Sequence, residues 1–479
     1  MNMNMKKVDN YKWIIEREGK MRVPGIIFSS ENLLKAIKED NSIEQVKNVA
    51  HLPGIQKYSL AMPDIHWGYG FPIGGVGAMD IEEGVISPGG VGYDINCGVR
   101  MIKTDLLASE IKGKIEELIN KIYSLIPCGV GSESDLNVSF STLKKVLEEG
   151  SFWAVSNGFG WDEDLEYTEE RGRLEGVDPD IISERALERG KQQLGTLGSG
   201  NHFIEIQKVS EIFDEKAAEM FGLKIDSVTI MIHTGSRGLG HQICSDWINK
   251  LMKARSKFKI DLPDEQLICA PLTSEEGKGY LSSMRAAANF AWANRQIILS
   301  RLREAFSKVF EKPAETLGIR LIYDVAHNIA KIEEHIVDGK LKKLCVHRKG
   351  ATRAFPPGHP ELPLKYSKWG QPVLIPGDMG TASYILLGTQ KAMEETFGST
   401  CHGAGRVLSR KKALQATGGR DLTKELREKG IYVKSKSVKT LREEAPDAYK
   451  DIDEVVEVVD KVGLSKKVVK MIPIAVVKG

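Results

Sequence analysis

Cysteine is scarce in this sequence and shows no disulfide framework. The 479 residues include six cysteines, and no two of them form a Cys-x-x-Cys pair. Small secreted domains that depend on disulfides are shorter and far richer in cysteine. The sequence therefore favours a reduced, intracellular protein, and we expect a cytoplasmic location.

Long apolar runs are missing as well. No stretch approaches the ~18 consecutive apolar residues of a transmembrane helix, and residues 1–7 lack the apolar core of a signal peptide. We expect no contact with a membrane. The net charge of only +2 leaves nucleic-acid binding open, because a nearly neutral total can hide a local basic patch.

Two common signatures of nucleotide chemistry are also missing. The sequence has no Gly-x-x-x-x-Gly-Lys-[Ser/Thr] phosphate-binding loop. It has no Lys-x-Asp-Gly motif of the kind that marks lysine-nucleotidylating ligases. If the protein uses a nucleotide, other residues must hold and activate it.

The residue type in excess is glycine, with 47 residues gathered mainly in loops. The average share of glycine in proteins is about 7%. One glycine-rich loop, Ser87–Arg100, contains Asp94 and Cys97 at a spacing that lets both side chains turn towards one point. A carboxylate and a thiolate together suit a divalent metal of intermediate softness. For this loop alone, a tight turn with a buried structural cysteine is an equally good interpretation.

Similar polar loops recur along the chain and add three widely separated histidines. His202 follows Gly-Ser-Gly-Asn, His233 ends an apolar strand-like run, and His327 ends Asp-Val-Ala-His. Strand alternation would place Asn201 and Glu205 on one face and His202 on the other, unless Asn201 and His202 still lie in the turn. Further glycine-rich or cationic loops occupy residues 233–240, 347–353, 376–380 and 399–406.

Together these histidines, Asp94 and Cys97 exceed the ligand count of one structural zinc site. A shared thiolate would bridge two ions, and paired ions ~3.5–4 Å apart serve displacement reactions at phosphorus. His402 differs from the other histidines, because we expect it to precede a helix that begins near Ala404. A helix start attracts anions, and a neutral imidazole there can attack phosphorus and carry a covalent adduct.

Two other segments are interpreted differently. Residues 58–80 hold prolines, glycines and aromatics around Asp64 and His66, which predicts a structured loop series. Those two side chains either orient metal ligands or satisfy local backbone groups. Residues 150–180 are polar and acidic, which favours a solvated insertion over a site.

Six motifs give the sequence a specific resemblance to the RtcB family of RNA-splicing ligases, over nearly the whole chain. They are Gly-Gly-Val-Gly-Tyr-Asp-Ile-Asn-Cys-Gly, Gly-Ser-Gly-Asn-His, His-Thr-Gly-Ser-Arg, Asp-Val-Ala-His-Asn, His-Arg-Lys-Gly-Ala-Thr-Arg and Cys-His-Gly-Ala-Gly-Arg. The resemblance implies an α+β fold of mixed and antiparallel sheets, packed together and flanked by helices.

Length alone would suggest two or three domains. The expected site residues are spread from position 94 to position 478, so no division of the chain leaves a complete site in one part. We therefore predict one interwoven catalytic domain over residues 1–479.

The resemblance implies a GTP- and manganese-dependent ligase. Such an enzyme joins an RNA end with a 2′,3′-cyclic phosphate or 3′-phosphate to a 5′-hydroxyl end, in tRNA splicing and RNA repair. His402 would take GMP from GTP, and the GMP would then pass to the RNA 3′-phosphate. Two Mn²⁺ ions would be held by Asp94, Cys97, His202, His233 and His327, with Cys97 shared.

The resemblance also implies the residues around the nucleotide and the RNA. The GTP pocket would be formed by Asn201, His202, Phe203, Ile204, Glu205, His327, Asn328, Pro376, Gly377, Asp378, Met379, Ser383, His402, Gly403, Ala404, Gly405, Tyr449 and Lys478. Candidates for RNA or triphosphate oxygens are Arg237, Arg348, Lys349, Arg353 and Arg406. Expected partners are tRNA halves or other broken RNA ends, and archease, a small activating protein known for the family.

Two other functions use part of the same residue set. A two-metal phosphoesterase would need the metal ligands but neither His402 nor Lys478. A non-catalytic RNA-binding protein with a structural metal would bind RNA whether or not Cys97 and His402 are intact. Labelling with GTP separates the ligase from the phosphoesterase. RNA binding that is indifferent to Cys97→Ala and His402→Ala, without a joined product, would indicate the binding protein.

Overall fold

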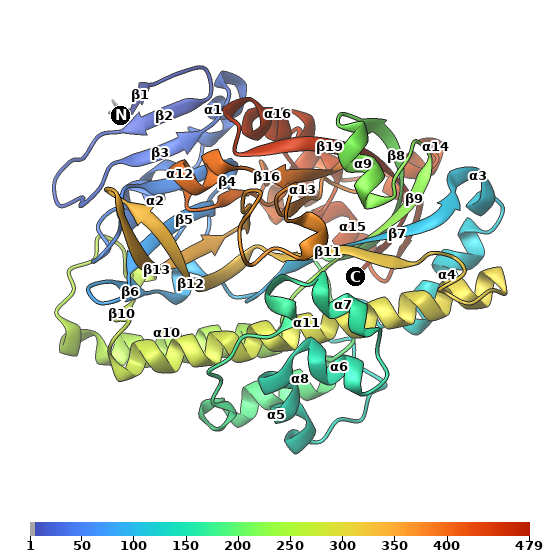
Figure 1. Cartoon of the computed structure of the whole chain (residues 1–479), viewed down its shortest axis with the longest axis horizontal. Coiled ribbons are helices and arrows are strands. Elements are labelled where there is room, and N and C mark those ends of the chain that lie inside the picture. The colour runs from blue at the N-terminus through green and yellow to red at the C-terminus, as the bar shows by residue number, and fades with distance from the viewer. Residues whose placement is uncertain (1–4) are drawn as a thin grey trace.

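Two large β-sheets organise the computed structural model, which describes residues 5–479 (Figure 1). The first sheet has seven strands in the order β1-β2-β3-β4-β5-β13-β12, and only β3 and β4 pair in parallel. Its strands are β1 Met5–Lys7, β2 Lys12–Ile15, β3 Gly25–Phe28, β4 Ser59–His66, β5 Ile73–Asp80, β13 Lys340–Lys349 and β12 Asn328–Val337.

The second sheet positions most of the candidate site. Its order is β11-β7-β9-β8-β19-β16-β15, all antiparallel, and β18 adds in parallel to β19. Its central strand β9 is buried along its whole length, as a continuous apolar run predicts. The strands are β11 Arg320–Ala326, β7 Gly98–Leu107, β9 Ser227–Thr234, β8 Phe203–Ile212, β19 Ser465–Lys478, β16 Ser383–Gly388, β15 Pro372–Ile375 and β18 Tyr432–Ser435.

Long helices cover one side of the sheets. α10 (Arg237–Phe258) and α11 (Glu275–Phe310) run together along the lower edge of Figure 1, with α5, α6 and α8 below them. The Ser274 side chain caps α11 by accepting a hydrogen bond from the backbone N–H of Gly277. The other helices in this part of the chain are α3 Ala108–Ile111, α4 Ile115–Leu125, α5 Phe140–Glu149, α6 Ser151–Ser156, α7 Asp162–Glu166 and α8 Glu184–Gln193.

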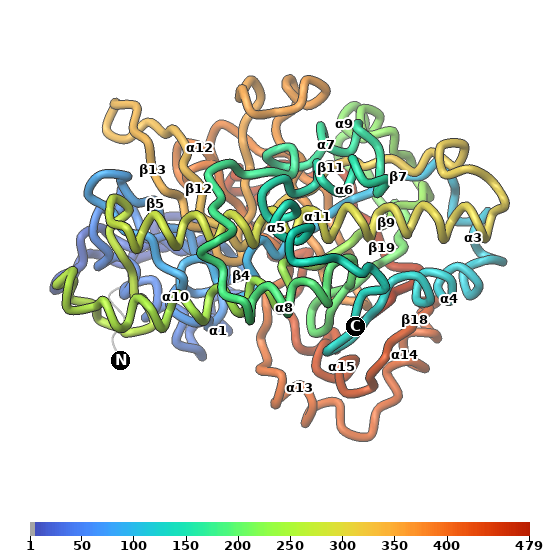
Figure 2. Tube along the Cα trace, turned by 90° about the horizontal axis from the view of Figure 1, so that it is seen from below, coloured from blue at the N-terminus to red at the C-terminus, as the bar shows by residue number. Residues whose placement is uncertain are grey.

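The later part of the chain adds short helices and a two-stranded sheet. Strands β14 (Ala351–Arg353) and β17 (Ser399–Cys401) pair with each other. Figure 2 shows α13, α14, α15 and β18 gathered at one end of the molecule. The remaining elements are α1 Glu31–Ile37, α2 Ser42–Val49, α9 Glu215–Phe221, α12 Gln390–Thr396, α13 Arg410–Ala416, α14 Leu422–Glu428, α15 Val438–Glu443, α16 Ile452–Val462, β6 Val85–Ile86 and β10 Ala270–Pro271.

The structure confirms the expected mixture of sheets and flanking helices, and it corrects the prediction for residues 58–80. Most of that stretch forms the paired strands β4 and β5 rather than a series of loops. Glycines and prolines suggested loops, but nearly every residue of both strands is buried, so packing outweighs their low strand propensity. No helix within residues 5–479 is long and apolar enough to span a bilayer.

The prediction of a solvated insertion at residues 150–180 is also wrong. Asp164 and Glu169 are each only 1% exposed. Arg303 donates two hydrogen bonds to the Asp164 carboxylate, at 2.6 and 2.7 Å, and Lys331 pairs with Glu169. Buried carboxylates require such partners. This acidic segment therefore attaches to α11 and β12 through ion pairs inside the protein.

Candidate functional site

One edge of the second sheet collects the predicted metal ligands. Cys97 directly precedes β7, His233 lies near the end of β9, and His327 directly follows β11. These strands are antiparallel neighbours, and Val99 lies opposite both His233 and Val325. The start of β7 and the ends of β9 and β11 therefore meet at the same edge.

His202 reaches that edge from the turn before β8. Its neighbour Phe203 begins β8 and lies opposite His233. Of the two arrangements left open by the sequence, the structure has Asn201 and His202 still in the turn. The ring is fixed there, because Nδ1 contacts the backbone oxygen of Leu197 at 3.0 Å.

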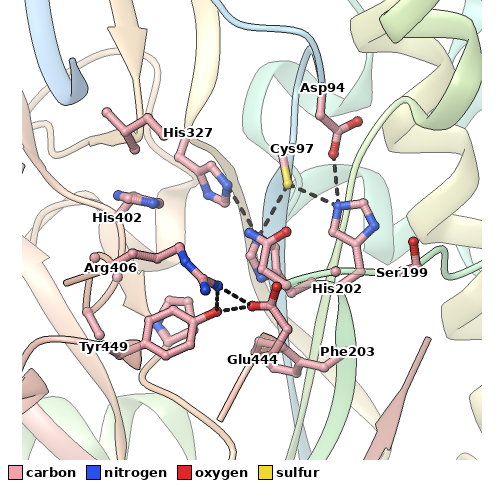
Figure 3. A pocket seen from close by; sticks show the side chains of 18 of the residues that line it. Asp94, Cys97, Ser199, His202, Phe203, His327, His402, Arg406, Glu444 and Tyr449 are labelled. Carbon is pink, nitrogen blue, oxygen red and sulfur yellow. Dashed lines mark hydrogen bonds and ion pairs between the residues drawn. The ribbon is translucent and has the colours of Figure 1, made fainter. Parts of the chain in front are cut away.

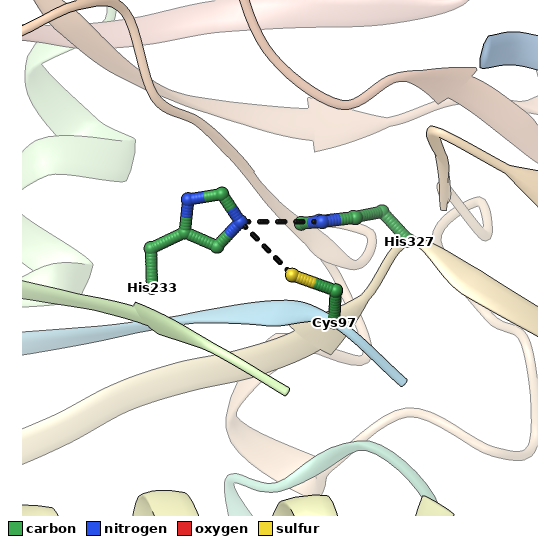
Figure 4. A group of neighbouring side chains, drawn as sticks. All are labelled: Cys97, His233 and His327. Carbon is green, nitrogen blue, oxygen red and sulfur yellow. Dashed lines mark hydrogen bonds between the residues drawn. The ribbon is translucent and has the colours of Figure 1, made fainter. Parts of the chain in front are cut away.

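The five predicted ligands form one continuous cluster (Figure 3). Cys97 Sγ lies 3.5 Å from His202 Nε2 and 3.3 Å from His233 Nε2. His233 Nε2 is 3.3 Å from His327 Nε2, as Figure 4 shows, and His202 Nε2 is 2.8 Å from an oxygen of Asp94. Ligand atoms far apart in the chain thus converge within a few ångströms.

Burial controls the charge of these groups. Burial lowers the pKa of His233 and His327 well below the usual range, so both imidazoles are neutral and have a free lone pair. Burial and the nearby Asp94 carboxylate raise the pKa of the Cys97 thiol. Burial opposes ionisation of Asp94, but the hydrogen bond to His202 and the charge of that ring hold the pKa of Asp94 low.

The cluster fits metal ions on its own chemistry. Its ligand atoms form two compact groups: Cys97 with His233 and His327, and Cys97 with Asp94 and His202. The ring nitrogens that point into the cluster are the Nε2 atoms of His202, His233 and His327, each within 3.5 Å of another ligand atom. Thiolate, imidazole and carboxylate are ligands for divalent transition metals. The two groups suit two cations that share Cys97.

His402 lies at one end of this cluster. Its ring centroid is 4.9 Å from that of His327. His402 Nδ1 is 2.5 Å from Asp64 Oδ2, which also accepts hydrogen bonds from the backbone N–H groups of His402 and Gly403. Because Nδ1–H donates to the carboxylate, the Nε2 lone pair is left free.

Asp64 is therefore the partner of His402 and does not bind a metal ligand. Burial opposes its ionisation, but the hydrogen bonds from His402 hold the pKa of Asp64 below its usual value. The helix expected near Ala404 is not formed there, because α13 begins only at Arg410. The carboxylate at position 64, rather than a helix terminus, orients His402.

The cluster and His402 open into one cavity of about 630 Å³. Its lining includes Arg237, Lys349 and Arg406 from the predicted phosphate contacts. It also includes most of the predicted nucleotide pocket: Asn201, His202, Phe203, Glu205, His327, Asn328, Pro376, Gly377, Asp378, Met379, His402, Gly403, Ala404, Gly405, Tyr449 and Lys478.

Some predicted site residues do not face this cavity. Ile204 is buried in the apolar cluster between β8 and α4, and Ser383 Oγ accepts a hydrogen bond from the backbone of Gly377. Arg348 is bound to Glu333, and Arg353 to Glu170 and Glu361. The prediction that these two arginines contact RNA is wrong, because carboxylates within the fold already occupy both guanidinium groups.

Lys349 lines the cavity but is not free to bind phosphate. Its ammonium donates to the backbone oxygens of Tyr69, Phe71 and Gly89. Burial lowers the pKa of Lys349 to about 7. The lysine thus ties the loop between β4 and β5 to the segment that carries Asp94, and the phosphate interpretation fails.

The side of the cavity formed by β8 and β19 has a distinct chemistry. Burial raises the pKa of Glu205 to about 8, and burial also raises the pKa of Asp378. The ammonium of Lys478 lies 5.4 Å from the ring centroid of Phe203. Glu205, Asp378 and Lys478 all line the cavity.

Sequence patterns did not reveal every residue of the cavity. Glu444 is buried and pairs with Arg406, Arg410 and the Tyr449 hydroxyl. Arg406 lies over the Tyr449 ring at 5.2 Å. Glu444 lies at the end of a charged helical stretch, where most carboxylates are exposed to solvent. The neighbouring sequence therefore does not identify it as a buried residue of the cavity.

A cluster able to hold two divalent ions, beside an imidazole oriented by a carboxylate, defines the class of metal-assisted nucleophilic sites. The sequence profile of the family described as tRNA-splicing ligase RtcB matches residues 45–479. This chain belongs to that family.

Full-length relatives support the assignment. A protein of Thermococcus kodakarensis is 53% identical over 476 residues, which cover 99% of both chains. Relatives in Archaeoglobus fulgidus and Methanococcus maripaludis are 54% and 55% identical, over 100% and 96% of this chain and 100% and 95% of their own. All three carry the name tRNA-splicing ligase RtcB.

Proposed function

We propose that this chain is an RNA ligase of tRNA splicing and RNA repair that acts through guanylylated His402. One observation carries the proposal: the imidazole held by Asp64 faces the same cavity as the Cys97 cluster and lies beside His327. A phosphoesterase would need only the cluster. An oriented nucleophile next to it supports transfer of a nucleotidyl group.

The first step follows from the free lone pair of His402. Nε2 attacks the α-phosphorus of GTP, the bond to the β-phosphate oxygen breaks, and pyrophosphate leaves. The proton stays on His402 Nδ1. Asp64 accepts the hydrogen bond from it and stabilises the positive charge that forms on the ring. Lys478 and Arg406 line the same cavity and offer positive charge to the phosphate oxygens.

The remaining steps complete the exchange of bonds. Water opens the 2′,3′-cyclic phosphate to a 3′-phosphate, whose oxygen attacks the GMP phosphorus and releases His402. The 5′-hydroxyl then attacks the 3′-phosphate, and GMP leaves. We propose two Mn²⁺ ions at Asp94, Cys97, His202, His233 and His327. When bound, they would neutralise charge on the phosphoryl oxygens.

The guanine base fits the side lined by Glu205, Asp378 and Tyr449. An ionised Glu205 accepts hydrogen bonds from the guanine N1–H and amino group, which an adenine cannot offer in that pattern. The Tyr449 ring provides a face for the base. Because the cavity is lined by residues from 66 to 478, we propose that residues 1–479 act as one catalytic domain.

The test is incubation with α-labelled GTP and Mn²⁺. We expect label bound to the protein, lost in acid and stable in base as a phosphoramidate requires, and absent from His402→Ala. The labelled protein should then join a cyclic-phosphate RNA to a 5′-hydroxyl RNA. A parent protein that takes no label would favour a phosphoesterase. Adding archease, the proposed activating partner, should raise the number of turnovers.

A further inference from the structure

Three aromatic side chains form a row along the cavity wall that the proposed chemistry does not use. The aromatic ledge consists of Tyr69, Tyr93 and His241, and all three line the cavity. The rings of Tyr69 and Tyr93 have centroids 5.5 Å apart and meet edge to face at 66°. Tyr93 and His241 are 5.7 Å apart and stack at 26°.

The ledge is assembled from separate parts of the chain. Tyr69 comes from the connection between β4 and β5, Tyr93 from the loop before β7, and His241 from the first turn of α10. Among the described residues, Tyr69 and Tyr93 belong to none of the three hydrophobic core clusters. Both are partly exposed, and His241 is exposed. Filling the core therefore does not account for the row.

The ledge begins next to a ligand that lies across the cluster from His402. Tyr93 directly precedes Asp94, and Figure 3 shows Asp94 and His402 at opposite ends of the cluster. The guanine side of the cavity, with Glu205 and Tyr449, is a separate wall. A molecule on the ledge would thus reach the cluster from the side opposite the guanylylated histidine.

A cation flanks the ledge. Arg237, the first residue of α10, lines the cavity, and its Nε donates to Thr196 Oγ1 at 3.2 Å. Aromatic faces beside cations are how proteins bind single-stranded RNA, by stacking bases and neutralising phosphates.

We propose that the aromatic ledge stacks the nucleobase of a terminal nucleotide of the RNA substrate, with Arg237 beside its phosphate. The inference rests on the proposed ligase function, since it names where that substrate lies. Stacking suits any base, so the ledge would fix the position of an RNA end without selecting its sequence. RNA ends of many different sequences could therefore bind at the ledge.

The test uses the full-length protein with Mn²⁺ and GTP, and short RNAs carrying 2-aminopurine at the terminal nucleotide. One RNA has the probe at its 3′-phosphate end and the other at its 5′-hydroxyl end. We compare the parent protein with Tyr93→Leu and with Tyr93→Phe, which keeps the ring. His241→Leu, at an exposed position, repeats the test where folding is not at risk.

We expect the parent protein to quench the probe at one of the two ends, which identifies the end on the ledge. Tyr93→Leu should lose that quenching and raise the KM for RNA about five-fold to one hundred-fold. Tyr93→Phe should behave like the parent. Self-guanylylation, which needs no RNA, should proceed in Tyr93→Leu, and this separates a lost RNA contact from a damaged metal site.

Two results would contradict the proposed role of the ledge. In the first, Tyr93→Leu or His241→Leu joins RNA with the same KM as the parent protein and quenches the probe to the same extent. The other is a higher KM for GTP without any change for RNA, which would place the guanine there. If the parent never takes GMP, the ligase function fails. The quenching titration still decides whether RNA stacks at Tyr93, because it requires binding and no joining.

Discussion

At the scale of single residues, the histidines of the cavity differ in the hydrogen-bond partner of Nδ1. His402 donates from Nδ1 to a buried carboxylate, which fixes the tautomer and leaves Nε2 as a nucleophile. His233 and His327 have no partner at Nδ1 within residues 5–479, and burial keeps them neutral. This arrangement suits the proposed roles, with His402 as the nucleophile and His233 and His327 as metal ligands.

The first prediction concerns Asp64→Asn. The amide can donate to His402 Nδ1, which would leave the proton on Nε2 and remove the attacking lone pair. We expect self-guanylylation to slow about 100-fold or more, measured with labelled GTP. Asp80→Asn, at the end of β5, is the matched control and should label at the parent rate. Equal rates in both variants would remove Asp64 from the mechanism.

The second prediction concerns pH and Glu205. Burial raises its pKa to about 8, so below that pH the carboxyl must lose a proton before it can accept two hydrogen bonds from guanine. Binding of GTP should therefore tighten as pH rises from 6.5 to about 8 and then level off. The slope is at most about ten-fold per pH unit.

Glu205→Gln supplies the comparison for that titration. The glutamine cannot ionise, so its GTP affinity should be weaker at pH 9 and nearly independent of pH over the same range. Fluorescence titration with a labelled GTP analogue measures both proteins. A parallel pH dependence in the variant would show that another group controls binding.

Sequence patterns predicted the ligands better than the residues that orient them. Asp94, Cys97, His202 and His233 stand in glycine-rich motifs, His327 follows an apolar strand-like run, and the cluster contains all five. Asp64 contacts His402 across 338 positions, and nothing local in the sequence marks that pair. Arg348 and Arg353 looked like phosphate contacts because their carboxylate partners lie in distant segments.

At the scale of elements, antiparallel register brings the site together. Five ends meet at one edge of the sheet: those of β7, β8, β9, β11 and β19. A residue at such an end is positioned by the hydrogen bonds of its strand, which makes the cluster rigid. The sequence indicated several of these strands, but their order in the sheet depends on packing between distant residues.

The third prediction concerns the acidic segment at α7. Asp164→Ala leaves Arg303 buried without its carboxylate partner and should destabilise the protein by about 3–5 kcal/mol. Glu163→Ala, in the same helix, removes only a half-exposed pair with Arg320 and should cost less than about 1 kcal/mol. Urea unfolding measures both. Similar losses would mean that the segment is held by something other than the buried pair.

At the scale of the whole molecule, β19 joins parts of the chain that are distant in sequence. It pairs with β8 on one side, and with β16 and β18 on the other. Its last residues bring Lys478 opposite Phe203, into the cavity. The apolar run at residues 468–477 is typical of a buried strand, and only the fold shows that it is an interior strand of the sheet.

The fourth prediction tests this central strand. Val469 is fully buried between β8 and β16, so Val469→Asp places an unpaired charge in the sheet. We expect loss of self-guanylylation together with a lower melting temperature. Lys466→Ala, an exposed position on the same strand, should leave both unchanged. A stable Val469→Asp protein that still labels would show that the two halves of the sheet do not depend on β19.

The late position of β19 has a consequence during translation. A ribosome has released almost all of the other strands before β19 emerges, and until then β8 and β16 have no neighbour between them. A growing polypeptide therefore lacks the strand that lies between β8 and β16 and brings Lys478 to the cavity. We expect chains that stop before β19 to bind no nucleotide.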